Sequence, residues 1–136
     1  MQSLVQRVRA GTPMVEFMGL EFVDSSDAVH RFGAPYSSCK NQLDVAFGGA
    51  IATGLTLAGW FSLTQAAESI TGSECNPMVA RAEFIFSAPH PGPELTFLSP
   101  VTHLSAWQGR LRHSMTTHLL DPQGHICSQA DLTFVL

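Results

Sequence analysis

A chain of 136 residues is long enough for one domain with a substantial core. Apolar residues make up 45% of it and charged residues 13%, so few charges remain to cover a monomer and we expect burial in an oligomer. The net charge of −4, with no run of Lys or Arg, excludes a general attraction to nucleic acid and a basic membrane-binding patch.

The cysteines Cys39, Cys75 and Cys127 are odd in number and widely spaced, and they form no CxxC pair. Reduced thiols in a cytoplasmic protein are the simplest interpretation. Arg7 and Arg9 stand near the N-terminus, but the apolar stretch of a signal peptide does not follow them. We therefore expect a cytoplasmic protein without a signal peptide.

The first part of the chain predicts a short helix followed by two strands. Residues 2–10 are amphipathic, and Gly11 and Pro13 are expected to stop this helix. Residues 20–23 and 28–32 have the composition of strands on either side of a Ser-Ser-Asp turn. The residues that follow, up to the next apolar segment, have loop chemistry.

Residues 47–67 contain no charged side chain across 21 positions, which is the length of a transmembrane helix. Four glycines and several Ser, Thr and Gln residues keep the hydrophobicity modest. A helix that is apolar nearly all round is also typical of the buried centre of a soluble protein. Because strands elsewhere need an element to pack on, we expect a buried helix that ends near Ile70, before Gly72, and no membrane segment.

Beyond this helix the apolar period changes from that of a helix to two, which predicts strands. Ala80, Ala82, Phe84 and Phe86 are expected to share one face of the first strand. The remaining expected strands are 94–104, 106–120 and 126–134, with a turn signal at 121–124. Two strands, one long helix and four strands predict an α+β domain, 1–136, whose sheet curls around the helix.

The stretch from Asn41 to Gly49 resembles the loop-to-helix signature of hotdog-fold acyl thioesterases. In that family an Asn stands six residues before an aromatic or His, and Gly-Gly follows, as Phe47-Gly48-Gly49 does here. Downstream, Phe84–Pro89 followed by Gly92 is similar to the family's strand and turn. The resemblance covers roughly residues 14–136 in element order and implies a hotdog fold, an antiparallel sheet wrapped around one long central helix.

Within this family, Phe47-Gly48-Gly49 and Ala58-Gly59-Trp60 are most similar to a thioesterase-like domain that some bacteria attach behind an acetyltransferase domain. The resemblance implies an enzyme that hydrolyses acyl-CoA or an acyl carrier protein thioester. It also implies pairing of helices in a homodimer or a dimer of dimers, in agreement with the low charge content. Phe47, Gly48 and Trp60 are expected to line the acyl site, although a buried aromatic such as Trp60 is more often a core residue.

Gly48 and Gly49 are suited to stabilising the charge that develops on a thioester carbonyl during hydrolysis. Free N–H groups at a helix N-terminus point at such an oxygen, and the helix dipole adds to them. Glycine removes the Cβ that would keep the carbonyl away. We expect the Gly49 N–H to form the oxyanion hole. The alternative is that the two glycines allow close packing of the helix on the sheet.

Asn41 and Asp44 are the polar residues of the motif that the chemistry needs. The Asn41 amide can hold the attacking water or the thioester carbonyl, or it can bond to its own backbone in a turn. Asp44 is the carboxylate of the motif, and hydrolysis needs a base or a nucleophile. The same position suits a helix N-cap, which would lower the carboxylate pKa and make it a weaker base. Both interpretations of each residue stay open.

Related subgroups carry a catalytic acid nine positions after the aromatic, and here this position is Thr56. A hydroxyl orients water but does not accept its proton at neutral pH unaided, and Thr56 is equally explained as a helix residue bonded to the preceding turn. Glu68, the nearest acid on this helix, lies three turns further on and is expected at its solvated end. The base is therefore Asp44, or an acid from another strand or subunit, or the reaction is slow.

Coenzyme A and acyl carrier proteins are both anionic, so the cations matter. Arg110 and Arg112 share a predicted strand face and are candidates for phosphate contacts, aided by Arg81, with a solvated sheet face as the alternative. The six histidines form no metal-ligand pattern, and we expect neither metal nor cofactor.

Two other functions compete with hydrolysis. A non-catalytic acyl-thioester binding domain stays open because Thr56 replaces the helix acid. A hydroxyacyl-thioester dehydratase is less well supported, because it needs an active-site His where Phe47 stands, and His90 lies after the helix.

Overall fold

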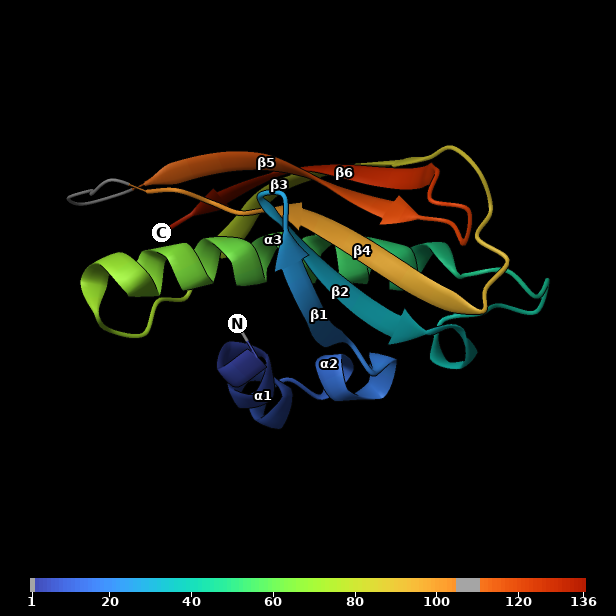
Figure 1. Ribbon diagram of the computed structural model, residues 1–136, viewed down its shortest axis with the longest axis horizontal. Helices are drawn as coiled ribbons and strands as arrows, with labels where there is room; N and C mark the ends of the chain where they lie inside the picture. Colours follow the sequence, from blue (N-terminus) through green and yellow to red (C-terminus); the bar gives the residue numbers. More distant parts are fainter. Residues whose placement is uncertain (1, 105–110) are drawn as a thin grey trace.

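The computed structural model describes residues 2–104 and 111–136 of the chain (Figure 1). In chain order its elements are α1 (Gln2–Gly11), α2 (Pro13–Met18), β1 (Glu21–Ser26), β2 (Val29–Pro35), the 3-10 helix η1 (Tyr36–Ser38), α3 (Gly48–Thr71), β3 (Met78–Phe86), β4 (Glu94–Pro100), β5 (Arg112–Leu120) and β6 (Ile126–Val135).

The six strands form one sheet in the order β1-β2-β4-β5-β6-β3, and every neighbouring pair is antiparallel. The sheet curves over α3, which lies along its inner face (Figure 1). This arrangement confirms the hotdog fold that the sequence predicts. β3 follows α3 along the chain and lies at one edge of the sheet, beyond β6.

The core lies between α3 and the inner face of the sheet. Phe61 of α3 is fully buried, as are Phe32, Phe97 and Phe134 of the strands, and the Phe32 and Phe61 rings stack with their centroids 5.6 Å apart. The α3 helix contains no proline and ends at Gly72, whose φ of 70° is left-handed and whose N–H donates to the Glu68 carbonyl oxygen. Burial of apolar side chains against the sheet therefore holds this long helix in place. None of the described helices is long and apolar enough to cross a membrane.

The N-terminal region contains one helix more than predicted. Pro13 does not end the helical region but begins α2, because a proline at the first helical position loses no intrahelical bond and has the right φ. α1 and α2 form a helical pair on the side of α3 that faces away from the sheet (Figure 1). Val15 and Met18 of α2 are buried, so this pair is part of the core.

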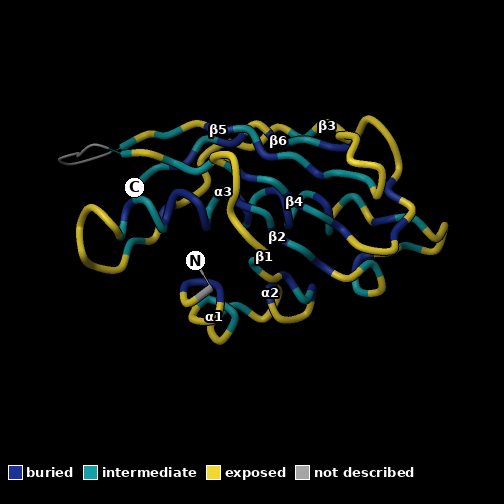
Figure 2. The backbone as a smooth tube through the Cα atoms, viewed as in Figure 1, coloured by how far each residue is buried: buried dark blue, intermediate teal, exposed yellow. Residues whose placement is uncertain are grey.

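The strands differ from prediction mainly at their ends. β4 ends at Pro100, four residues early, and residues 106–110 of the strand expected over 106–120 lie outside the described residues. The expected alternation is confirmed in β5, where Met115 and Leu119 are buried while Ser114 is exposed. In β3 a register shift between Val79 and Arg81 leaves Ala80 without a paired partner, whereas Ala82 and Phe84 pair with Leu132 and Ala130 of β6. Figure 2 shows how much of β3 is exposed.

Candidate functional site

The loop before α3 is folded by Asn41. The Asn41 N–H donates to the Val45 carbonyl oxygen at 2.8 Å, and the Asp44 N–H donates to the Asn41 carbonyl oxygen at 3.1 Å. The Asn41 side-chain Oδ1 accepts the N–H groups of Leu43 at 2.9 Å and Val45 at 3.4 Å. The Asn41 amide therefore stabilises the turn of its own loop through its side-chain oxygen. Its nitrogen donates no hydrogen bond within the residues that the structure describes.

Asp44 lies in this loop with a left-handed φ of 61°, and its side chain is 78% exposed. Its Oδ1 accepts a hydrogen bond from the Tyr36 hydroxyl at 3.0 Å and lies 3.8 Å from the Lys40 ammonium nitrogen. Burial and this bond to the Asp44 carboxylate raise the pKa of Tyr36. Asp44 is not the N-cap of α3, because Phe47 occupies that position. The N-cap interpretation is therefore wrong, and the carboxylate is free of the helix N–H groups that would weaken it as a base.

The turn that contains His90 packs against this loop, and sequence reasoning missed its role. His90 is fully buried, and its carbonyl oxygen accepts the Ala46 N–H at 2.9 Å. Its Nδ1 accepts the Gly92 N–H at 3.1 Å, so its Nε2 carries the proton that it donates to the Leu120 carbonyl oxygen at 3.0 Å. The Tyr36 ring lies over Gly92, where a Cβ would be 2.8 Å from Cγ of that ring. His90 is thus a structural residue, which agrees with the weak support for a dehydratase.

The first turn of α3 is open at its N-terminal end. Phe47 is the N-cap and provides no side-chain hydrogen bond, so the N–H groups of Gly48 and Gly49 are among those that an α-helix leaves without an intrahelical acceptor. A Cβ on Gly48 would have its nearest neighbour, the Phe86 ring, 3.9 Å away. A Cβ on Gly49 would meet the half-exposed Phe47 ring at 2.5 Å. Close packing of helix on sheet does not explain this pair of glycines, since no buried sheet residue presses on them.

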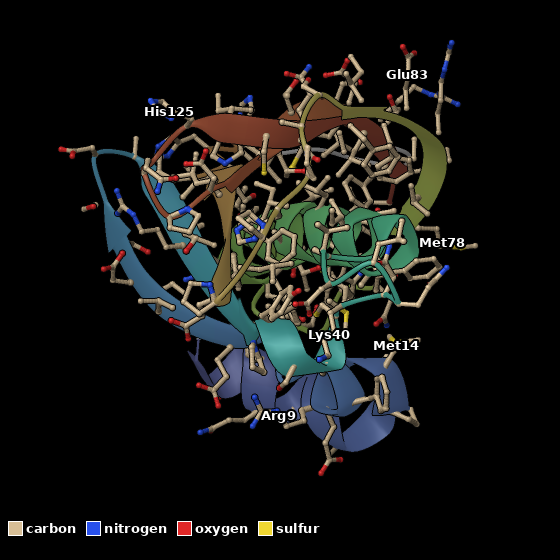
Figure 3. The ribbon with its side chains drawn as sticks, turned by 90° about the vertical axis from the view of Figure 1, so that its right-hand side faces the viewer. Arg9, Met14, Lys40, Met78, Glu83 and His125 are labelled. Carbon is tan, nitrogen blue, oxygen red and sulfur yellow. The ribbon has the colours of Figure 1, made fainter. Side chains whose placement is uncertain are left out.

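A cavity of about 370 Å³ opens beside this first turn. Gly49, Ala50 and Thr53 form its α3 wall. The other wall comes from α2, which the sequence did not predict, through Met14, Phe17 and Met18. Met14 and Phe17 are largely exposed apolar side chains, and Lys40 lies at the same end of the molecule (Figure 3). The uncapped first turn thus borders an apolar cavity, and Lys40 is the one cation among the described residues that line it.

Thr56 and Trp60 line a second cavity of about 450 Å³, further along the same helix. The Thr56 hydroxyl donates to the Ala52 carbonyl oxygen at 2.8 Å, so its bond to the preceding turn is confirmed. The Trp60 Nε1–H donates to the Pro77 carbonyl oxygen at 2.8 Å, which fixes the half-buried indole. The structure therefore brings Thr56 and Trp60 together, but it places both away from the first turn of the helix.

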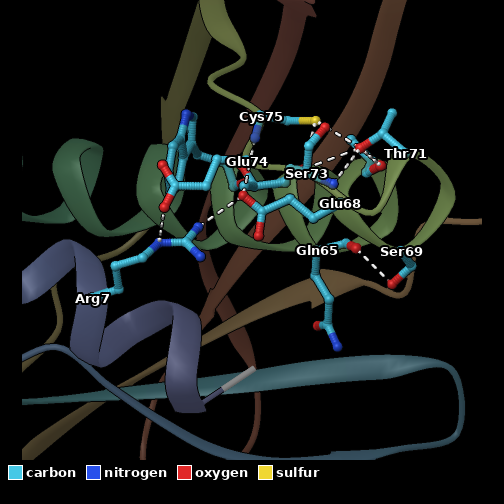
Figure 4. A network of polar contacts seen from close by, with 11 residues as sticks. Arg7, Gln65, Glu68, Ser69, Thr71, Ser73, Glu74 and Cys75 are labelled. Carbon is cyan, nitrogen blue, oxygen red and sulfur yellow. Dashed lines mark hydrogen bonds and ion pairs between the residues drawn. The ribbon is translucent and has the colours of Figure 1, made fainter.

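The sequence led us to expect a solvated Glu68 at the end of α3, but the structure surrounds its carboxylate with bonding partners. Its Oε2 lies 2.7 Å from an Arg7 guanidinium nitrogen, and it accepts the Cys75 N–H at 3.0 Å (Figure 4). Arg7 also lies 3.8 Å from a Glu74 carboxylate oxygen. The Glu68 carboxylate therefore connects α3 to α1 and to the loop after α3, and its ion pair with Arg7 already occupies it.

The predicted arginines do not meet at the helix N-terminus. Arg81 and Arg112 are exposed and pair with Thr133 and Val135 of β6, on the outer face of the sheet. Figure 3 shows Glu83, two residues after Arg81, pointing outward from this face. Arg110 lies outside the described residues. The cation that the structure places near Gly49 is Lys40, which the sequence analysis did not single out.

Cys39, Cys75 and Cys127 are free thiols, and burial raises the pKa of Cys39 and Cys127. Within residues 2–104 and 111–136, no group of three His, Cys, Asp or Glu side chains is placed to hold a metal ion.

Several solved structures of proteins named as thioesterases have the same fold. A "putative thioesterase" from Shewanella oneidensis matches with a TM-score of 0.83 and 25% identity, over 98% of this chain and 94% of its own. A thioesterase from Pseudomonas aeruginosa, in a Gln-to-Ala variant, matches with a TM-score of 0.77 and 16% identity, over 99% and 92%. A thioesterase from Haemophilus influenzae matches with a TM-score of 0.74 and 12% identity, over 99% and 89%.

The chain matches no protein-family model, and its sequence matches no curated protein. The structural neighbours support an acyl-thioester hydrolase at the level of the fold family. The narrower resemblance to the domain that follows an acetyltransferase stays a prediction.

Proposed function

We propose that this protein hydrolyses an acyl thioester carried by coenzyme A or acyl carrier protein. The observation that supports this most strongly is the first turn of α3, where Gly48 and Gly49 leave their N–H groups uncapped beside an apolar cavity. Such a turn stabilises negative charge on a carbonyl oxygen, and the cavity accepts the acyl group. Lys40 at the edge of the cavity is suited to the anionic carrier.

In the proposed reaction the thioester carbonyl oxygen accepts the Gly49 N–H. Water adds to the carbonyl carbon, and its proton passes to the Asp44 carboxylate, which is exposed and accepts a bond from Tyr36. The tetrahedral intermediate carries its negative charge at the first turn of α3. When the C–S bond breaks, the sulfur leaves with the electron pair and takes the proton back from Asp44, which yields a carboxylic acid and a free thiol. The Asn41 side-chain nitrogen is the group available to hold the water or the carbonyl.

We propose a homodimer that uses β3. This edge strand has free N–H and C=O groups along one side, and Met78, Val79, Ile85 and Phe86 on it are exposed apolar residues. A second copy paired along β3 would cover them and would bring further acidic residues to the site, the alternative source of a base. In sedimentation experiments, the Phe86→Glu variant should then shift the wild-type dimer towards monomer, whereas Val23→Glu, at an exposed position of β1 on the opposite edge of the sheet, should not. A monomeric wild type contradicts the dimer.

Thiol release from acyl-CoA tests the hydrolysis, and two isosteric variants test its residues. Asn41→Asp keeps the side-chain oxygen that folds the loop but replaces the amide nitrogen, so we expect an unchanged melting temperature and a loss of about 100-fold in kcat/KM. Asp44→Asn keeps the acceptor for Tyr36 but removes the base, and should lower kcat at least tenfold. Full activity in both variants would remove the catalytic assignment. Tight binding of acyl-CoA by the wild type without thiol release would favour the non-catalytic binding domain instead.

A further inference from the structure

The two cavities described above lie end to end along one face of α3. Gly49, Ala50 and Thr53 line the first, and Thr56, Leu57 and Trp60 line the second. At about 100° of rotation per residue these six positions fall within one third of the helix circumference. We call them the open face of α3. It starts at the uncapped first turn and runs towards the middle of the helix.

Across from α3, both cavities are lined by residues of one short stretch of the chain, α1 and α2. Met14, Phe17 and Met18 of α2 face the first cavity, while Val8, Gly11 and Thr12 face the second. The α1–α2 pair therefore runs beside the open face over both cavities. Both cavities thus lie between α3 and the α1–α2 pair, on the side of α3 that faces away from the sheet (Figure 1). The space that the two cavities would form if joined is called the groove below.

The floor of this groove is apolar even where its residues are polar by type. The Thr53 hydroxyl donates to the Gly49 carbonyl oxygen at 2.8 Å, and the Thr56 hydroxyl donates to the Ala52 carbonyl oxygen at 2.8 Å. With each hydroxyl turned to the helix backbone, the methyl group is left to face the groove. The open face carries no charged side chain, which suits a hydrocarbon chain and not a polar ligand.

The groove has a defined far end. The Trp60 indole is fixed by its bond to the Pro77 carbonyl oxygen, and Arg7 and Glu74 form an ion pair at the edge of the second cavity (Figure 4). From Gly49 to Trp60 the helix rises about 16 Å, at about 1.5 Å per residue. An extended chain advances roughly 1.2 Å per bond, since three backbone bonds span about 3.6 Å, so this length holds roughly 13 bonds.

We propose that the two cavities form one acyl groove, selective for straight chains of about 12 to 14 carbons, with Trp60 as the residue that limits their length. This rests on the proposed function, because the thioester carbonyl at Gly49 sets where the chain begins. The occupant is the substrate's own acyl chain, since the groove is continuous with the N–H groups that would hold its carbonyl. A short or branched acyl group would leave the second cavity empty.

The test measures binding without hydrolysis, using thioether analogues of acyl-CoA with four, eight, twelve and sixteen carbons in calorimetric titrations. We expect the Kd to fall at least tenfold from four to eight carbons and again from eight to twelve, and no further at sixteen. Complete burial of one methylene is worth about fourfold, or ~0.8 kcal/mol, so these steps require only partial burial. A Kd that does not depend on chain length would overturn the groove, and would show that another element, such as a second copy's helix, fills it.

Three variants locate the chain. Thr53→Phe blocks the passage between the cavities and should reduce the twelve-to-four-carbon affinity ratio at least tenfold. Trp60→Ala opens the far end and should move the optimum to sixteen carbons. Ser69→Phe places the same bulk on an exposed position of α3 outside the groove and should leave the ratio as in wild type. If Trp60→Ala does not fold, the Thr53→Phe ratio decides, and an unchanged ratio there contradicts the proposal.

These measurements separate the groove from the proposed hydrolysis. Thioethers are not cleaved, so a chain-length profile without thiol release from true thioesters would contradict hydrolysis and leave the groove in place. Thiol release from true thioesters, together with equal Kd values for all chain lengths, would support hydrolysis and contradict the groove.

Discussion

The first turn and the middle of α3 use glycine in opposite ways. In the first turn, Gly48 and Gly49 meet no buried sheet residue, and their nearest neighbours are the exposed rings of Phe86 and Phe47. Further along, a Cβ on Gly54 would overlap the buried Phe97 ring, and one on Gly59 would lie 2.9 Å from both the Leu132 Cδ1 and the Met115 sulfur. All four are glycines of one helix, but packing against the sheet explains only Gly54 and Gly59.

This difference between the two pairs of glycines reflects two requirements on α3, close packing against the sheet and access for a ligand. The middle of α3 has to approach the sheet closely, so a missing side chain there increases stability. The first turn faces solvent and a cavity, where glycine costs stability relative to alanine. A glycine that the fold does not need, beside uncapped N–H groups, is evidence for contact with a ligand.

The largest effect is expected from Gly54→Ala. The new Cβ would lie 2.5 Å from Phe97 Cε1 and 2.7 Å from Cε2, and this ring is fully buried and has no space to move. Overpacking of this kind costs about 1–3 kcal/mol, and we expect about 3 kcal/mol less free energy of unfolding in urea titrations. A loss below about 1 kcal/mol would show that the sheet can move away from the helix.

Gly49→Ala should act on activity and not on stability. Its Cβ would displace the Phe47 ring, which is 56% exposed and can rotate into solvent, so the melting temperature should stay the same or rise. The methyl group would then occupy the approach of the thioester carbonyl, and kcat/KM should fall about tenfold, equivalent to ~1.4 kcal/mol. An unaltered kcat/KM would mean that the carbonyl does not bind at this turn.

Gly59→Ala should have a smaller effect than Gly54→Ala, although both glycines face the sheet. Its neighbours are the flexible ends of Leu132 and Met115, which can shift by a few tenths of an ångström. Part of the cost is offset by the better helix propensity of alanine, so we expect a loss of about 1 kcal/mol, measured in the same titrations. Equal losses at both positions would contradict the distinction between rigid and flexible neighbours.

The smallest effect concerns His30, which lines a cavity beside the second half of α3 together with Ser62 and Gln65. Burial lowers the pKa of His30 below the usual value of a histidine, so the folded protein favours the neutral side chain. The unfolded chain takes up the proton first as the pH falls, and the free energy of unfolding should therefore decrease below pH 6.5. His30→Gln should weaken this decrease, measured in urea titrations at a series of pH values, and an unchanged decrease would contradict the assignment to His30.

Sequence reasoning succeeded where the signal was local and periodic. The long uncharged helix, the change to a period of two and the Asn-to-Gly-Gly spacing together predict the fold that the structure confirms. The predicted start of α3 beside Phe47 also agrees, because glycine and the preceding loop residues define it locally. The second helix was missed because Pro13 has two meanings, a helix end or a first helical position, and neighbouring residues do not distinguish them.

The motif in the sequence indicated where a thioester would be held. Its residues belong to one loop and the helix turn that follows it, so they lie close together independently of the rest of the fold. Distances between elements needed the tertiary structure. It showed that the Asn41 oxygen folds its own loop, that Asp44 is clear of the helix N–H groups, and that Arg81 and Arg112 lie on the outer face of the sheet. It also placed α2 and Lys40 beside Gly49. These relations depend on how the sheet curls and on which strand faces are covered, and a residue's neighbours along the chain do not determine either.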